Sequence, residues 1–487
     1  MVFSKIIRMT RAVIIIGAGA AGLMAGRELS AAGIPVTILE AAPVPGGRIR
    51  TLQGPEFPLS ASPLSSPDPA LSPAPASSPD SLSSPGAPTN PPSSPDPARD
   101  RVFSGPIEAG AEFVHGNLPL TLGLLKAADI GYRPVKGQMV RVRKGEWGSR
   151  DIFSGDWDLL MEKMGQLQQD ISIAAFLDSR FPGERYAALR DSIRSFAEGY
   201  DLADIQRAST LALYREWQGE GETEYRVNGG YGRLIQFLAD QCTTHGCSIR
   251  YRSVATRIDW SPGKVDVTLA DGQTFSGSHL IVTVSLGILQ QEPASAASSA
   301  SSPAALSFFP PIPAYRAAAR QLGYGSVIKI LMEFRRPFWE PKASGTGFIL
   351  SDEAIPTWWL QAPDNRCLLT GWLTGRAMRT FRQLEDEAAR LDSCLVSLAA
   401  IFAVNTSFLK EQLMAYRIID WMQAPFIQGG YSFETVDCAS ARKLLRQPVE
   451  GTLIFAGEAL YDGAAPATVE AALTSGKEAA EIIKPHH

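Results

Sequence analysis

The residues of this chain that could do chemistry begin with the glycines of GAGAAG, at Gly17, Gly19 and Gly22. With this spacing, the first glycine permits a tight turn, the second lets backbone approach a pyrophosphate, and the third lets a helix pack on a strand. Glu40 follows 23 residues after Gly17, where a carboxylate can accept hydrogen bonds from ribose hydroxyls. The spacing predicts a nucleotide site, and a tight turn without a ligand is the alternative.

The flanking elements are those that such a site needs. Val13–Ile16 is a run of apolar, β-branched residues, typical of a strand buried on both faces. Residues 23–32 predict a helix whose N-terminal N–H groups favour bound phosphate, and 35–39 predict a second strand that ends at Glu40. This order of elements indicates a Rossmann-like α/β domain.

Two further groups of glycines and polar residues follow. Gly46 and Gly47 come directly before Arg48, so the backbone can bend around a ligand while the guanidinium offers donors to phosphate. The motif EAGAEFVHG occupies residues 108–116. Its small and polar members are Gly110, Ala111, Glu112 and His115. We expect the fold to bring both groups to the nucleotide site.

Composition excludes several classes of protein. The 487 residues suffice for two or three domains, and 46 Lys plus Arg nearly balance 50 Asp plus Glu, so no strong field favours nucleic acid or an anionic membrane. The five cysteines are scattered and predict no disulfide framework. Cys242, His245 and Cys247 lack the second ligand pair of a metal site, so we predict no metal.

Targeting signals are also not expected. Lys5, Arg8 and Arg11 precede an apolar run, but that run is the strand before GAGAAG, and its removal as a signal peptide would destroy the site. No apolar stretch reaches the roughly 18 residues that a membrane span needs. We therefore expect a cytoplasmic protein with no membrane anchor and no nucleic-acid partner.

The composition changes sharply along the chain. Residues 54–100 are almost wholly Pro, Ser, Ala and Asp, which cannot bury enough apolar surface to offset the entropy of ordering, so we predict a disordered insertion. A docking role for this insertion is the alternative. We predict a nucleotide domain built from 10–53, 101–124, 225–290 and 426–487, a second domain with a helical part at 125–224 and a sheet part at 306–425, and low-complexity segments at 54–100 and 291–305.

With these motifs in place, the chain resembles the flavin-dependent amine oxidase family, which includes monoamine, polyamine and L-amino-acid oxidases. The resemblance covers nearly the whole length apart from the two low-complexity segments. Its motifs, in order, are GAGAAG with Glu40, GGR at 46–48, EAGAEFVHG, IVTVSLGIL at 281–289, GYGSVIK ending at Lys329, FAGE and PATVEAAL. It implies a Rossmann-like FAD-binding domain with an interleaved α+β substrate domain.

The resemblance implies FAD as cofactor. Val254 would meet the adenine, Gly457 and Glu458 the ribityl and pyrophosphate groups, and Thr468 with Val469 the flavin N1–C2 edge, where a helix N-terminus stabilises negative charge. The implied cofactor-binding residues are Gly17, Gly19, Ala20, Ala21, Gly22, Glu40, Gly46, Gly47, Arg48, Gly110, Ala111, Glu112, Val254, Gly457, Glu458, Ala467, Thr468 and Val469. Because GGYSF has no cysteine beside it, we expect FAD to be bound non-covalently.

Three residues are candidates for catalysis. Lys329 sits in an apolar run, and the resemblance places it by the flavin N5 through a water; a solvated strand lysine is the alternative. Tyr431 is a candidate for one of the aromatic rings that line the flavin. The second ring commonly stands where this chain has Ala465. His115 would lie near the substrate amine, or would have a structural role.

The implied reaction is oxidation of a C–N bond of a small-molecule amine, with hydride transfer to flavin, imine hydrolysis, and reoxidation by O₂ to H₂O₂. A desaturase or protoporphyrinogen-oxidase-like enzyme and a non-catalytic FAD-binding protein are the alternatives. Histone demethylases of the family carry extra helical modules, which we do not expect at this length. Phe348, Trp358 and Trp359 are candidate walls of the substrate pocket. The sequence does not identify the amine or the oligomeric state.

Overall fold

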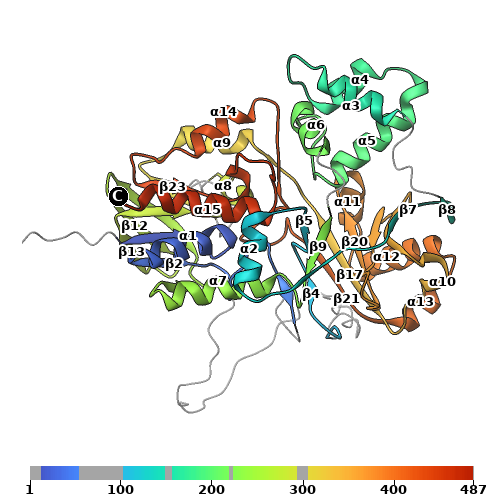
Figure 1. The fold of residues 1–487 in the computed structure, drawn as a ribbon, viewed down its shortest axis with the longest axis horizontal. Coiled ribbons are helices and arrows are strands. Elements are labelled where there is room, and N and C mark those ends of the chain that lie inside the picture. Colours follow the sequence, from blue (N-terminus) through green and yellow to red (C-terminus); the bar gives the residue numbers. More distant parts are fainter. Residues whose placement is uncertain (1–11, 54–101, 149–155, 219–222, 293–304, 486–487) are drawn as a thin grey trace, which may run out of the picture.

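The computed structural model describes residues 12–53, 102–148, 156–218, 223–292 and 305–485 (Figure 1). The insertion predicted at 54–100 lies outside these residues, as does most of the loop predicted at 291–305. The described chain forms a parallel-sheet domain and a domain built on a larger mixed sheet, as predicted for the α/β fold class.

The first domain contains a five-stranded parallel sheet in the order β10-β2-β1-β14-β23. These strands are β1 (Val13–Ile16), β2 (Val36–Leu39), β10 (Ser248–Arg250), β14 (His279–Val282) and β23 (Leu453–Phe455). The strand before GAGAAG therefore lies at the centre of the sheet, and strands from the middle and the end of the chain complete it.

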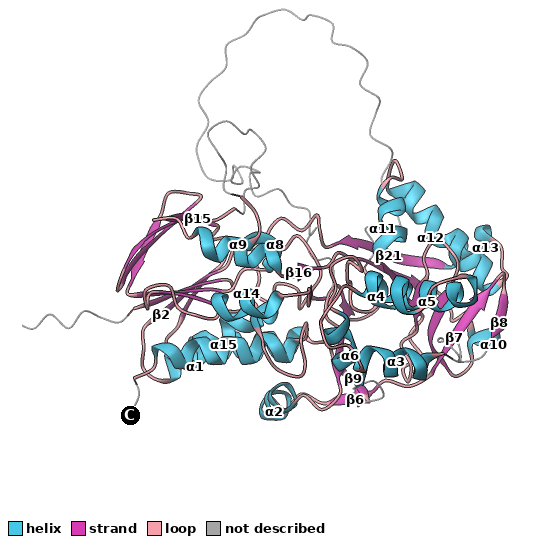
Figure 2. Ribbon diagram, turned by 90° about the horizontal axis from the view of Figure 1, so that it is seen from above, coloured by secondary structure: helices cyan, strands magenta, loops and turns pink. Residues whose placement is uncertain are grey.

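Both faces of this sheet are covered, and its strands β1 and β23 are apolar and buried at every position. Val13 and Ile15 pack against the helices α1 (Ala20–Ala31), α7 (Gly232–Thr244) and α15 (Val469–Ile483). The opposite face carries Ile14 and Ile16, which pack against a second sheet and α9. Figure 2 shows α1 and α15 on one side of the parallel sheet and α9 with β15 on the other.

The second layer is a four-stranded sheet in the order β13-β12-β11-β15. Its elements and neighbours are β11 (Ala255–Ser261), β12 (Lys264–Leu269), β13 (Thr274–Gly277), β15 (Ser307–Phe309), α8 (Leu286–Leu289), α9 (Pro313–Gln321) and α14 (Cys438–Leu445). The strands β12 and β13 form an antiparallel hairpin, with Asp271 and Gly272 in the turn between them. Although β10 and β11 are close in sequence, they belong to different sheets.

The larger sheet has seven strands in the order β21-β17-β20-β19-β18-β7-β8. Its strands are β7 (Gln138–Arg143), β8 (Glu146–Gly148), β17 (Ile328–Phe334), β18 (Thr346–Ser351), β19 (Thr357–Trp359), β20 (Leu368–Leu373) and β21 (Leu413–Asp420). One face packs against helices α10 (Glu340–Ala343), α11 (Gly375–Arg382), α12 (Glu387–Phe402) and α13 (Thr406–Gln412). All its neighbouring strands are antiparallel except β7 and β18.

The helical part predicted at 125–224 is only partly helical. It begins with three strands, β6 (Tyr132–Pro134), β7 and β8, because residues 138–143 alternate between the two faces of the large sheet. Four helices follow, and they enclose a core of their own above that sheet (Figure 1). They are α3 (Trp157–Gly165), α4 (Ile173–Arg180), α5 (Ala187–Gly199) and α6 (Thr210–Gln218), with a 3₁₀ turn at Glu184–Tyr186.

Short elements join the two domains. The strands β5 (Phe113–His115), β9 (Glu224–Val227) and β6 form a three-stranded sheet between them. The remaining elements are β3 (Thr51–Leu52), β4 (Ile107–Glu108), α2 (Pro119–Ala127), β16 (Gly323–Tyr324), β22 (Ser432–Phe433) and a 3₁₀ turn at Glu458–Leu460. The motif EAGAEFVHG therefore lies on β4 and β5, at the junction of the domains.

No single helix among the described residues is long and apolar enough to cross a membrane. Together, α12 and α13 meet the length and composition requirement, but they bend by 112° at the break between them. Leu395, Leu398 and Ile401 of α12 are buried in the core of the large sheet.

Candidate active site

A cavity of about 2060 Å³ lies between the two domains. It exceeds the roughly 300–1,000 Å³ of typical small-ligand sites, so it has room for a dinucleotide and a further ligand. The predicted site residues that line it are Gly17, Gly19, Ala20, Ala21, Glu40, Gly46, Gly47, Arg48, Gly110, Ala111, Glu112, His115, Val254, Lys329, Tyr431, Gly457, Glu458, Ala467, Thr468 and Val469. The fold thus brings together residues from both ends of the chain.

Gly22 is the predicted site residue that does not line the cavity. A Cβ atom there would lie 1.9 Å from the carbonyl oxygen of Gly17, so glycine is required for α1 to pack against the turn. Gly17 has a φ of +104°, which favours glycine. Gly19 caps α1, and the nearest atom to a Cβ there would be 4.0 Å away. The N-terminus of α1 is therefore open to a phosphate.

Glu40 lies at the far end of this cradle and is buried. Its carboxylate accepts hydrogen bonds from the backbone N–H groups of Ala18 at 2.6 Å and Ala42 at 2.8 Å. Burial raises the pKa of Glu40, and these two hydrogen bonds oppose that shift. The carboxylate is thus held against the first turn beside the cavity, where its remaining lone pairs can accept from ribose hydroxyls.

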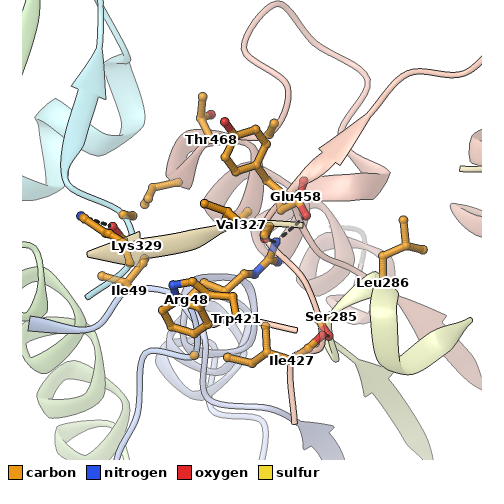
Figure 3. A pocket seen from close by; sticks show the side chains of 18 of the residues that line it. Arg48, Ile49, Ser285, Leu286, Val327, Lys329, Trp421, Ile427, Glu458 and Thr468 are labelled. Carbon is orange, nitrogen blue, oxygen red and sulfur yellow. Dashed lines mark hydrogen bonds and ion pairs between the residues drawn. The ribbon is translucent and has the colours of Figure 1, made fainter. Parts of the chain in front are cut away.

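Arg48 and Glu458 form an ion pair across the chain, with Arg48 Nη1 2.7 Å from Glu458 Oε1 (Figure 3). The same nitrogen donates to the carbonyl of Gly430 at 2.8 Å, and Ser432 Oγ donates to Glu458 Oε2 at 2.6 Å. Burial alone would lower the pKa of Arg48, but Glu458 and Tyr324 raise it. The guanidinium therefore stays charged and fixed beside the cavity, as pyrophosphate binding requires.

The last helix points its N-terminus at the cavity. Thr468 caps α15 by accepting from the N–H of Ala471 at 3.2 Å, and Ala467 before it has a φ of +59°. In the first turn, Glu470 accepts from Thr121 N–H at 2.6 Å and so ties α15 to α2. This helix end supplies a fixed positive potential at the cavity wall.

Lys329 is 1% exposed and lies on β17. Its Nζ donates to Glu112 Oε2 at 2.8 Å and to the carbonyl of Gly110 at 3.0 Å, and it lies 5.5 Å from the centre of the Trp359 ring. A solvated strand lysine, the alternative from the sequence, is excluded by this burial. Figure 3 shows its Nζ bonded beside the cavity.

Glu112 is the centre of a larger buried cluster. Its Oε1 accepts from Arg226 Nε at 3.1 Å and from Trp359 Nε1 at 3.1 Å. Arg226 also donates to the carbonyls of Leu360 at 3.0 Å and Ala362 at 2.9 Å. Burial alone would raise the pKa of Glu112, but Lys329 and Arg226 outweigh it and lower the pKa to about 2. The ionised carboxylate of Glu112 therefore fixes the position of Lys329. Its predicted contact with the cofactor stays a prediction.

The free face of the large sheet forms the opposite wall of the cavity. Phe348 and Trp359 line it, together with Trp372 and Phe113, and ring centres of Phe113 and Trp359 are 5.8 Å apart. Trp358 is a correction: it faces the other side of the sheet and is fully buried in that core. Because neighbouring residues of a strand point to opposite faces, only one member of a Trp-Trp pair can line the cavity.

The predicted catalytic aromatic residue, Tyr431, donates its hydroxyl hydrogen bond to the carbonyl of Tyr200. Tyr461 and Ala465 also line the cavity, so a second ring is present there although Ala465 is small. His115 Nδ1 lies 2.9 Å from Glu224 Oε1, and its side chain is 40% exposed. His115 thus lines the cavity and is paired with Glu224 of β9. Its role near the substrate amine stays a prediction.

Several site residues were not predicted from the sequence. Arg226, Trp372 and Phe113 are the main ones, and Trp421 donates to the carbonyl of Ala109 at 3.0 Å behind EAGAEFVHG. The strand β9 has the sequence EYRV, with two charged residues in four, so no pattern distinguished Arg226 from a solvated residue. The described residues contain no group of three His, Cys, Asp or Glu side chains that could hold a metal.

Comparison with known protein families identifies the family to which this chain belongs. The model of the flavin containing amine oxidoreductase family matches residues 154–484, and that of an NAD(P)-binding Rossmann-like domain matches residues 15–69. The first match covers more than half of the chain. The chain therefore belongs to the flavin containing amine oxidoreductase family.

Individual relatives are distant. Lysine-specific histone demethylase 1B of Mus musculus is 25% identical over 515 residues, which cover 97% of this chain and 53% of that protein. Polyamine oxidase 1 of Oryza sativa subsp. japonica is 26% identical over 325 residues, 58% of this chain and 60% of that protein. The chain thus spans about half the length of the mouse demethylase.

Solved structures share the fold. Wild-type putrescine oxidase bound to putrescine superposes with a TM-score of 0.72 at 17% identity, over 97% of this chain and 98% of that one. Cyclohexylamine oxidase from Brevibacterium oxydans gives a TM-score of 0.71 at 17% identity, with the same coverage. The predicted two-domain α/β fold is confirmed by this similarity.

The cavity fits the cofactor that the family implies. The glycine turn leaves space at Gly19, where a Cβ would be free of close contacts, and the N-termini of α1 and α15 both open onto the cavity. Glu40 lies at the ribose end of the glycine turn, and Arg48 offers a fixed positive charge. These groups suit an adenine dinucleotide with an anionic pyrophosphate.

Proposed function

We propose that the protein oxidises a C–N bond of an amine, with FAD held non-covalently in the cavity and O₂ as electron acceptor. FAD, when bound, would take hydride from the carbon next to the nitrogen and return the electrons to O₂ as H₂O₂. The imine product would be hydrolysed. None of the five cysteines, all of which are described, lines the cavity, which supports non-covalent binding.

Different residues of the cavity hold the cofactor and orient the amine. Glu40, Arg48 and the N-terminus of α1 hold the adenine dinucleotide, and the N-terminus of α15 supplies positive potential for the reduced ring. Phe348 and Trp359 exclude water and orient the amine against the cofactor. Tyr431 and His115 line the same space.

The observation that carries this proposal is the buried ammonium of Lys329. It lies in the cavity wall between the two domains, at the end of a glycine-rich turn, and Glu112 with Gly110 fixes its position. A cation held there can donate to a water beside the cofactor and can stabilise negative charge that develops on O₂. A purely structural lysine would not need to face the cavity.

The test is a panel of monoamines, polyamines and L-amino acids given to the FAD-loaded protein, with H₂O₂ and imine-derived aldehyde or keto acid measured together. We expect at least one class to yield both products in equal amounts. Oxidation of an apolar polyene or a porphyrinogen without oxidation of any amine would replace the proposal with a desaturase or porphyrinogen oxidase. Bound FAD without any turnover would indicate a binding protein.

A further inference from the structure

Arg141 differs from the buried cations Lys329, Arg226 and Arg316, whose side chains all have hydrogen-bond partners. It lies half-buried on β7 and lines the cavity, yet it has no ion pair or side-chain hydrogen bond with any residue that the structure describes. Its Nε is buried without a partner. Lys329, Arg226 and Arg316, by contrast, all donate to carboxylate or carbonyl oxygens. A desolvated guanidinium without a partner is costly, so its donors are available to a ligand.

The charged groups around Arg141 do not neutralise it. Asp352 lies nearby, but its carboxylate is 3.7 Å from Arg143, and both of those side chains are more than 60% exposed. Burial lowers the pKa of Arg141, Arg143 lowers it further, and Asp352 opposes the shift. Glu353, next to Asp352 in sequence, also lines the cavity. Among the described residues, no carboxylate forms an ion pair with the guanidinium of Arg141, so this cation has no direct partner in the cavity wall.

Strand register places Arg141 in line with Lys329. Directly paired residues across five neighbouring strands are Lys329 with Trp372, Trp372 with Thr357, Thr357 with Leu350, and Leu350 with Arg141. All five residues line the cavity. Directly paired residues share one face of a sheet, so the row is a continuous floor. Four steps of about 4.8 Å between strands put the backbones of the two end residues about 19 Å apart.

The floor between the two cations is uncharged and mostly apolar. Trp372 and Leu350 lie in the row, and Phe348 and Trp359 line the cavity from the same face. Such a surface suits an extended apolar chain, while a guanidinium suits a carboxylate or phosphate through two parallel hydrogen bonds. The separation of the two strands favours an elongated ligand over a free α-amino acid, whose amine and carboxylate are attached to the same carbon atom.

We propose that Arg141 is an anion-binding subsite for the far end of an elongated amine substrate, whose carboxylate or phosphate group it binds while the amine lies near Lys329. The proposal rests on the proposed amine oxidation for the identity of the near end. It names a substrate class: a long, largely apolar amine with a terminal anionic group.

The test measures binding without turnover. Straight-chain carboxylates and phosphate monoesters of increasing length, and alcohols of matched length, are titrated calorimetrically into the FAD-loaded protein. We expect anionic probes above a threshold length to bind more tightly than the alcohols, and the better of the two head groups identifies the natural anion. Equal affinity for the alcohols at every length would overturn the proposal.

Variants locate the subsite. Arg141→Gln should weaken binding of the long anionic probe by about 10- to 100-fold, whereas Arg141→Lys, which keeps the charge but not the paired donors, should recover part of the loss. The matched control is Arg143→Gln, two residues along the same strand, which should change affinity by less than about fivefold. Equal losses in Arg141→Gln and Arg143→Gln would contradict the assignment, since they would reflect general surface charge.

Kinetics separate this proposal from the proposed function. With ω-amino carboxylates, Arg141→Gln should raise KM about 10-fold or more, with a smaller change for an uncharged amine of the same length. If no amine is oxidised but the anionic probes still require Arg141, amine oxidation is wrong and the subsite stands. If amines are oxidised with no preference for a terminal anion, the subsite is wrong and the oxidase stands.

Discussion

At the scale of single residues, Lys329, Glu112 and Arg226 form a cluster with one carboxylate between two cations. A buried cluster of this kind need not stabilise the folded state relative to apolar residues of the same size. Removing one member is nevertheless costly, because it leaves a charge buried without its partner. The cluster therefore fixes the position of Lys329 at the cavity wall.

Replacing Glu112 should expose that cost. Glu112→Gln leaves the ammonium of Lys329 and the guanidinium of Arg226 without their shared carboxylate, so the free energy of unfolding should fall by about 3–5 kcal/mol, measured by urea denaturation at pH 7. Glu411→Gln, at an exposed position, is the control and should change it little. A loss in Glu112→Gln no larger than in the control would show that the cluster does not form.

Glu108 and Glu112 should affect stability at opposite ends of the acid range. The pKa of Glu112 is lowered from 4.5 to about 2. Its stabilising contribution to the free energy of unfolding is therefore present above pH 4.5 and is lost as the pH falls through 2. Burial raises the pKa of Glu108 to about 7. Its contribution to the free energy of unfolding is therefore present below pH 4.5 and is lost as the pH rises through 7. Glu108→Gln should flatten the pH dependence of stability between pH 4.5 and 7; an unchanged profile would contradict the raised pKa.

Lys329→Met should keep bound FAD, because Glu40, Arg48 and the N-terminus of α1, which are proposed to hold the dinucleotide, are not hydrogen-bonded to Lys329. It should slow either reduction of the flavin by amine or its reoxidation by O₂ by at least about tenfold, since one charged hydrogen-bond donor is lost. Stopped-flow absorbance measures the two half-reactions separately. Unchanged rates in both would remove Lys329 from the mechanism.

At the scale of elements, α1 and α15 pack so closely that a Cβ on Gly476 would lie 2.1 Å from the carbonyl oxygen of Ala21. Gly476→Ala should therefore push the last helix away from the glycine turn, and we expect it to weaken FAD binding and to lower stability by about 1–3 kcal/mol. Gly123→Ala, in α2 with no atom within 4 Å of the added Cβ, is the control and should be neutral or stabilising. Thermal unfolding and flavin fluorescence measure both effects.

Periodicity and glycine spacing were sufficient to predict the elements that carry the cofactor motifs. The strands β1 and β2 lie within two residues of their predicted bounds, because apolar runs mark them directly. Helix α1 begins three residues earlier than predicted, since Gly19 is its cap. The strands β6 to β8 were missed, because short strands between helices carry little periodic signal. Their pairing fixes them instead: β6 pairs with β9, β7 with the distant β18, and β8 with β7.

At the scale of the whole molecule, the site exists only where segments distant in sequence meet. Arg48 and Glu458 are 410 positions apart, and Lys329 and Glu112 are 217 apart. Motifs could predict that these residues reach one cavity, but not that they bind one another, because side-chain partners depend on how the two domains pack. The same holds for Arg226 and for the row that ends at Arg141.

Since both domains line the cavity, FAD should stabilise the folded chain by mass action. At a free concentration 100 times Kd, the free energy of unfolding should rise by about 2.7 kcal/mol, measured by urea denaturation with and without FAD. Arg48→Met should reduce this gain by weakening FAD binding. A protein equally stable with and without saturating FAD would not use this cavity for FAD.

The central claim is that this chain oxidises amines through bound FAD. Its most direct test is the visible absorbance of the FAD-loaded protein mixed with a panel of amines in the absence of O₂. We predict that the oxidised flavin band is lost with at least one amine and returns when O₂ is admitted, with release of H₂O₂. A band that persists with every amine, while FAD remains bound, would contradict the claim.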